Sequence, residues 1–143
     1  MKKLLFVAVA VSGLVLVSCN KNQSAVKKLD GTWTVTKAAT TDGGVTYDPI
    51  ATGDVTQTMT FTECKLKTDE WCNMTVTTNI TGWPESTESD VYRVTGDGMT
   101  LETKDDAAAT EIWSMTIDEL TKSSMKATQV DGSTTTVIEA TKN

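Results

Sequence analysis

The sequence contains no histidine, only two prolines, and 13 Lys+Arg against 19 Asp+Glu, so its formal net charge is −6. The absence of histidine excludes imidazole-based acid–base catalysis, Ser-His nucleophiles and His-ligated metals. An acidic chain also lacks the basic face that a phosphate backbone requires, so we expect no nucleic-acid partner. We find no nucleophile with a partner base, and the sequence therefore predicts no enzyme, no metal site and no cofactor.

What the sequence has in excess is threonine, at 28 of 143 residues. Threonine is β-branched and fits a pleated strand, where its hydroxyl faces water. Threonine or a charged residue alternates with apolar residues along most of the chain, which is the period of a half-buried strand. The length allows one domain with a modest core. These features together predict a sheet protein with one wet face.

Eight segments show this alternation. The expected strands span residues 31–38, 55–62, 71–78, 90–95, 99–104, 111–117, 124–129 and 134–140. Gly96-Asp97-Gly98 and Asp131-Gly132 supply the backbone freedom of tight hairpins. We expect one short helix at 24–29 and a long loop at 40–53. The predicted fold class is all-β, an eight-stranded antiparallel up-and-down barrel, which leaves no open sheet edge.

The N-terminal segment has the layout of an export signal. Two lysines, Lys2 and Lys3, precede an apolar run from Leu4 to Leu16, too short for a stable spanning helix. The following Leu-Val-Ser-Cys, ending at Cys19, resembles the bacterial lipobox. That resemblance implies a signal peptide at 1–18, a diacylglyceryl group on Cys19 and a polar tether at 19–28 before the domain at 29–143. An ordinary cleaved signal with an unrelated cysteine is the alternative.

An acyl anchor on Cys19 implies attachment to a membrane without spanning it, because each buried CH₂ contributes about 0.8 kcal/mol. Residue 20 is asparagine and not aspartate, which in the sorting rule for such lipoproteins disfavours retention in the inner membrane. We therefore expect a protein of the cell envelope, on the outer membrane and facing the periplasm. Removal of residues 1–18 also removes Lys2 and Lys3, which changes the net charge from −6 to −8.

Two cysteines remain when Cys19 carries lipid, and an even remainder in an exported protein suggests a disulfide between Cys64 and Cys72. Regular strand alternation places Cys64 on the threonine face and Cys72 on the core face. A bulge or an irregular turn would remove that conflict. Two free thiols are the alternative.

The first expected strand opens with Leu29-Asp-Gly31-Thr-Trp33, which resembles the Gly-x-Trp signature of the lipocalin barrel. Residues 59–61, 92–96 and 117–125 also resemble the lipocalin-like domain of small envelope lipoproteins. The resemblance implies that Gly31 and Trp33 pack the barrel floor. In the main lipocalin group a late arginine packs over this tryptophan, whereas the single arginine of this chain is Arg93.

The interior of an eight-stranded barrel either is filled by its own side chains or holds one small ligand. The candidate lining residues are Trp33, Met59, Phe61, Met74, Tyr92, Met99, Leu101, Trp113 and Met115. Methionine suits an irregular apolar pocket and also fills gaps in an ordinary core. Two functions stay open: a lipid-anchored module that binds a small hydrophobic molecule, and a structural lipoprotein with a filled barrel that meets another envelope protein.

Overall fold

The computed structural model describes residues 20–66 and 70–143. The expected signal peptide and Cys19 lie outside the described residues. The elements are α1 (Lys21–Leu29), β1 (Gly31–Asp42), β2 (Val45–Tyr47), β3 (Val55–Phe61), β4 (Cys72–Ile80), β5 (Ser86–Thr95), a 3₁₀ turn (Gly96–Gly98), β6 (Thr100–Lys104), β7 (Trp113–Leu120), β8 (Ser124–Asp131) and β9 (Thr134–Lys142). No helix among these residues is long and apolar enough to cross a membrane.

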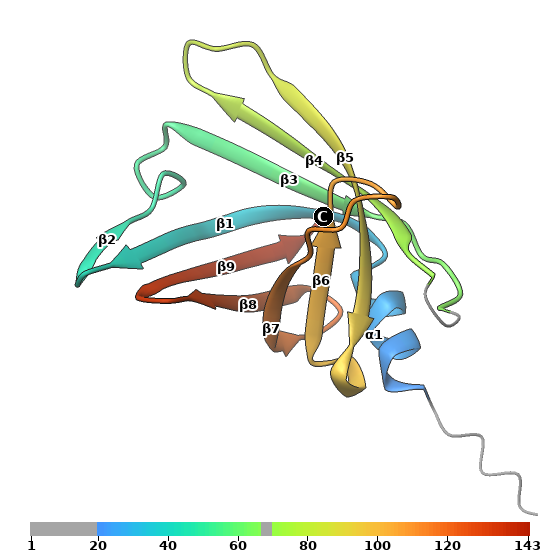
Figure 1. Cartoon of the computed structure of the whole chain (residues 1–143). Helices are drawn as coiled ribbons and strands as arrows, with labels where there is room; N and C mark the ends of the chain where they lie inside the picture. Colours follow the sequence, from blue (N-terminus) through green and yellow to red (C-terminus); the bar gives the residue numbers. More distant parts are fainter. Residues whose placement is uncertain (1–19, 67–69) are drawn as a thin grey trace, which may run out of the picture.

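The strands form one antiparallel sheet in the order β2-β1-β3-β4-β5-β6-β7-β8-β9, and pairing of β1 with β9 closes it (Figure 1). The eight-stranded antiparallel barrel expected from the sequence is therefore confirmed, with β2 as one additional strand. The segment 40–53 is not the long loop that we expected. The end of β1 turns back at Gly43 and Gly44 and pairs with β2 through Thr40–Tyr47 and Asp42–Val45.

The two ends of the barrel differ in what covers them. Residues 62–66, 96–99 and 121–123 connect strands at the end that α1 covers, and we call this the closed end (Figure 1). Residues 43–54, 81–85, 105–112 and 132–133 connect strands at the opposite end, which we call the open end. At the open end β3, β4 and β5 fan away from β1, β8 and β9 in Figure 1.

Helix α1 is docked against the barrel. Asn20 caps it, because its side-chain oxygen accepts hydrogen bonds from the backbone N–H groups of Asn22 and Gln23 at 3.1 and 3.3 Å. Val26 and Leu29 are fully buried. The helix begins at Lys21, three residues before the expected position. The polar segment expected as a tether is thus helical from residue 21 and packs on the domain.

The core lies in the closed half of the barrel, where Trp33, Phe61 and Tyr92 are essentially fully buried. Trp33 Nε1 donates a hydrogen bond to the Leu29 carbonyl at 2.6 Å, which ties the first strand to the helix. The rings of Phe61 and Tyr92 meet edge to face with centroids 5.0 Å apart. Tyr92 Oη donates to the Thr62 carbonyl at 3.0 Å, and burial raises the pKa of this phenol, with Asp30 and Glu63 adding to the effect.

Gly31 stands at a position where the backbone and the available space both require glycine. Gly31 has φ +111°, a conformation that L side chains rarely adopt, and a Cβ there would lie 2.9 Å from Lys142 Cε. Lys142 Nζ lies 5.4 Å from the centre of the Trp33 ring and donates a hydrogen bond to the Lys28 carbonyl at 3.1 Å. The cation over the Trp33 ring is therefore Lys142. Arg93 lies on the outer wall instead.

Cys64 and Cys72 form the expected disulfide, with their Cα atoms 5.5 Å apart. β3 ends at Phe61, so Cys64 lies outside any strand and is free of strand alternation. Cys72 begins β4 with its side chain in the core. Regular alternation would have placed Cys64 and Cys72 on opposite faces of the sheet. The irregular segment after β3 removes this conflict.

Candidate ligand-binding site

The strand register identifies the inner face of the barrel, because directly paired residues share a face and neighbours along a strand alternate. Six of the nine expected lining residues are buried in the closed half. These are Trp33, Met59, Phe61, Met74, Tyr92 and Leu101. They form one cluster with Ala25, Val26 and Leu29 of α1, so side chains fill this half of the interior.

The other three expected residues behave differently. Met115 pairs with Leu101 and Trp113 pairs with Thr103, so both lie on the inner face of β7. Met115 is half-buried, and Trp113, nearer the open end, is 48% exposed. Met99 is a correction: it precedes β6 in a helical backbone conformation, is 59% exposed, and lies beside α1 outside the barrel.

Exposure of the inner face increases towards the open end. Along β4 the inward side chains of Cys72 and Met74 are 1% and 5% exposed, Val76 is partly buried, and Ile80 is 43% exposed. The same trend holds on β7 from Ile117 to Trp113. Apolar side chains on the inner face of the open half are therefore accessible to solvent, which is the property a binding site for an apolar molecule requires.

Polar groups share this inner face. Thr40 and Thr136 hydroxyls lie 3.2 Å apart, and Gln57 Nε2 donates to Thr78 Oγ1 at 3.1 Å. On β5, Glu88 pairs with Val76 and Asp90 pairs with Met74, which places both carboxylates inward. Burial raises the pKa of Asp90, and the carboxylates of Glu88 and Asp105 raise it further. The inner face of the open half is thus apolar with an acidic flank.

Large apolar side chains also surround the open end. Val45 and Tyr47 of β2, Trp83 of the β4–β5 hairpin and Ile112 before β7 are exposed by 44–74%. The contribution of β2 was missed because its segment was interpreted as a loop, although the alternation Val45-Thr46-Tyr47 is the signal of a short strand.

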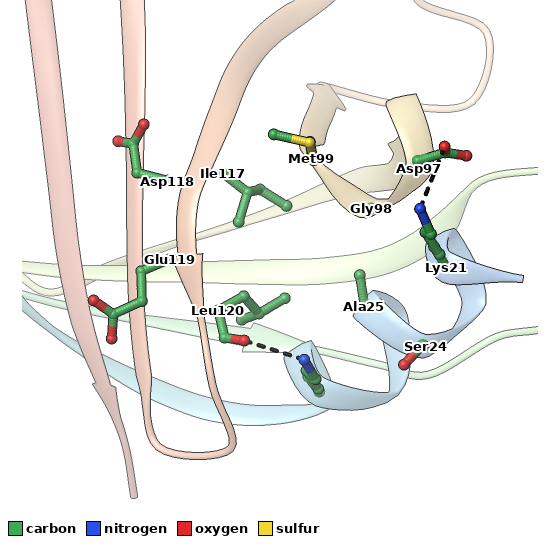
Figure 2. A pocket seen from close by; sticks show the side chains of 11 residues that line it. Lys21, Ser24, Ala25, Asp97, Gly98, Met99, Ile117, Asp118, Glu119 and Leu120 are labelled. Atoms are coloured by element: carbon green, nitrogen blue, oxygen red, sulfur yellow. Dashed lines mark hydrogen bonds and ion pairs between the residues drawn. The ribbon is translucent and has the colours of Figure 1, made fainter. Parts of the chain in front are cut away.

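A hollow of about 370 Å³ lies outside the barrel between α1 and β7 (Figure 2). Figure 2 shows Lys21 reaching Asp97, 3.6 Å away, and Met99 across from Ala25. Asn22 Oδ1 accepts a hydrogen bond from the Gly98 N–H at 2.6 Å, and Lys28 Nζ donates to the Leu120 carbonyl at 3.3 Å. These contacts hold the helix to the barrel. We therefore interpret the residues around this hollow as structural.

The side chains at the open end combine apolar surface with negative charge. Among residues 20–66 and 70–143, no group of three His, Cys, Asp or Glu side chains is arranged to hold a metal ion. Trp113 and Ile80 offer apolar surface, and Glu88 and Asp90 offer negative charge beside it.

Comparison of the chain with models of known protein families found no match, and a search of curated protein sequences found no relative.

Proposed function

We propose that the protein is a lipid-anchored lipoprotein of the cell envelope, on the outer membrane and facing the periplasm, whose barrel binds a small hydrophobic molecule at its open end. The observation that carries the binding proposal is the exposure of Trp113 (48%) and Ile80 (43%) on the inner face of the barrel. Apolar surface accessible to water inside a concave sheet gains free energy when a ligand covers it. The Gly-x-Trp resemblance, with Gly31 and Trp33 at the barrel floor, supports the same function.

The charge of the inner face selects among hydrophobic molecules. Glu88 and Asp90 lie inward on β5, so a ligand with a cationic group is attracted and a carboxylate is repelled. The preferred ligand class is therefore an apolar body with a positive or neutral polar group, and fatty acids fit less well.

The test is native mass spectrometry of the protein with envelope lipid extract, followed by titration with dodecyltrimethylammonium and with laurate, monitored by tryptophan fluorescence. We expect a retained adduct and tighter binding of the cation than of the carboxylate of equal chain length. Trp113→Ala should weaken binding about tenfold, which corresponds to about 1.4 kcal/mol. Val130→Ala is the matched control, because Val130 is 69% exposed on the outer wall. Absence of any adduct together with unchanged fluorescence would contradict the proposal.

The anchor is tested separately. Replacement of Cys19 by serine should abolish incorporation of a labelled acyl chain in cells that process lipoproteins, because the thioether can no longer form. Persistence of the label in Cys19→Ser would show that the lipid is attached elsewhere or that the signal is of another type.

The second candidate, a structural or interaction lipoprotein, is favoured by the filled closed half of the barrel. In that case Tyr47 and Trp83, exposed by 62% and 73% at the open end, contact an envelope protein and no ligand enters. The same titrations distinguish the two functions, since the structural role predicts no response to either amphiphile.

A further inference from the structure

A cluster of lysines lies at the closed end of this acidic chain. Lysines gather at the closed end, in α1, in the β7–β8 turn and at the end of β9. The four that line one hollow there, with Ser24, are Lys27, Lys28, Lys122 and Lys142. Carboxylates lie at both ends, with Asp42, Asp48, Asp54, Glu85, Asp106 and Glu111 at the open end and Asp30, Glu63 and Asp97 at the closed end, where Asp97 pairs with Lys21. The four lysines of this hollow therefore form a local basic surface on a molecule of net negative charge.

The lysine-lined hollow, of about 520 Å³, is formed by elements far apart in the sequence. Lys28 and Lys142 are held in place: Lys28 Nζ donates to the Leu120 carbonyl, and Lys142 Nζ donates to the Lys28 carbonyl. Lys27 and Lys122 are exposed and have no carboxylate partner among the described residues. Lys27 and Lys28 also complement the C-terminal end of the α1 dipole, but that role does not account for Lys122 or Lys142.

The position of the chain terminus gives this surface its orientation. Asn20, the cap of α1, is at the closed end, and Cys19 precedes it directly in the sequence. Burial of Val26 and Leu29 fixes the helix to the barrel, and one residue spans at most about 3.6 Å. A membrane attached at Cys19 therefore lies against the closed end and its lysines.

We propose that the closed end docks on an anionic phospholipid surface, with Lys27, Lys28, Lys122 and Lys142 against the headgroups, so that the open end points away from the membrane. The proposal rests on the membrane attachment proposed above, but not on ligand binding. Each lysine near an anionic surface is expected to raise partitioning by about fivefold.

The experiment is acetylation footprinting of lysines by mass spectrometry, on the full chain reconstituted in vesicles of phosphatidylcholine alone or with phosphatidylglycerol. We expect Lys27 and Lys122 to react at least about threefold more slowly on the anionic vesicles, and the difference to vanish in 1 M NaCl, where the Debye length is about 3 Å. Lys37 and Lys126, which pair with Glu139 on the outer wall, are internal controls whose rates should not change.

A pair of double variants with equal charge change completes the test. In the wild type, Lys28 should also be acetylated more slowly on anionic than on neutral vesicles. This difference in rate should disappear in Lys27→Gln/Lys122→Gln and persist in Lys37→Gln/Lys126→Gln. Equal rates on neutral and anionic vesicles, or equal protection of wall and end lysines, would overturn the docking proposal. Protection by inorganic phosphate without vesicles would overturn it in favour of a free anion. If the chain floats with vesicles of neither composition, the proposed membrane attachment through Cys19 is contradicted. This outcome distinguishes failure of the anchor from failure of the docking proposal.

Discussion

The closed and open halves of this barrel are built from the same strands with the same alternation, yet they differ in nearly every physical property. In the closed half the inward side chains of Trp33 and Tyr92 are fully buried and α1 covers the end. In the open half the inward side chains of Trp113 and Ile80 keep nearly half of their surface exposed. We therefore expect stability to depend on the closed half, and the open half presents the apolar surface that we propose binds a ligand. A hollow lined by four lysines also distinguishes the closed end, whereas carboxylates lie at both ends.

The largest expected effect contrasts two tryptophans. Trp33→Ala removes a fully buried ring and its hydrogen bond to Leu29, and should lower the free energy of unfolding by about 3–5 kcal/mol. Trp113→Ala, on the same face of the barrel but half exposed, should change stability by no more than about 1 kcal/mol. Urea unfolding monitored by circular dichroism measures both. Similar losses in the two variants would show that the halves are not energetically distinct.

The contribution of the helical cap is tested by Leu29→Ala, which removes a fully buried side chain from the junction of α1 and the core. We expect a loss of about 3 kcal/mol in the same urea experiment, because a cavity opens beside Trp33. Lys27→Ala, at an exposed position of the same helix, is the control and should shift stability by no more than about 0.5 kcal/mol. If Leu29→Ala behaves like Lys27→Ala, the helix is not part of the cooperative unit.

The disulfide constrains the closed end. Its reduction should lower stability by about 2–3 kcal/mol, the chain-entropy value for a loop with a sequence separation of 8. Thermal melting with and without dithiothreitol measures the effect, and a Cys64→Ala/Cys72→Ala variant should not respond to the reductant. Affinity for an amphiphile at the open end should not change on reduction. A parallel loss of affinity would mean that the two halves are coupled.

The smallest effect concerns Asp90. Burial, with the Glu88 and Asp105 carboxylates, raises the pKa of Asp90 above the ordinary 3.8. The folded protein therefore binds this proton more tightly than the unfolded chain, and the associated stability is fully present below pH 3.8 and is lost as the pH rises through the raised value. Asp90→Asn should reduce this decline and raise stability at pH 7 by no more than about 0.5 kcal/mol. An unchanged slope of melting temperature between pH 3.5 and 7 would contradict the assignment.

Much of the fold was predictable because strand alternation is local. Threonine alternating with Val35, Met59, Phe61 and Val76 identified the strands, and hairpin residues such as Asp131-Gly132 ordered them. The disulfide was predicted because two cysteines, Cys64 and Cys72, remain when Cys19 carries lipid. Met99 was assigned to the interior wrongly, because alternation was extended through a residue that belongs to the turn before β6. The start of α1 was missed by three residues because Asn20 was interpreted as part of a flexible segment and not as a helix cap.

The candidate site was only half predictable. The sequence indicated which residues face inward, but not which of them water reaches, because that depends on the cover at each end of the barrel. Val45 and Tyr47 of β2 were missed since a three-residue strand carries too little periodicity to stand out from a loop. Glu88 was not recognised as inward because β5 begins earlier than its apolar residues suggest.

The sequence by itself determined the strand pattern, the excess of threonine in the strands, the cysteine pair and the polarity of the N-terminal segment. Only the tertiary structure decided which end of the barrel is closed, that Lys142 lies over Trp33, and that lysines from α1, the β7–β8 turn and β9 share one surface. The physical reason is the sequence separation over which each kind of interaction acts. Alternation and turn chemistry act between neighbours in the chain, whereas the cover of a barrel end and the grouping of charges depend on docking between segments about a hundred residues apart, as between Lys28 and Lys142.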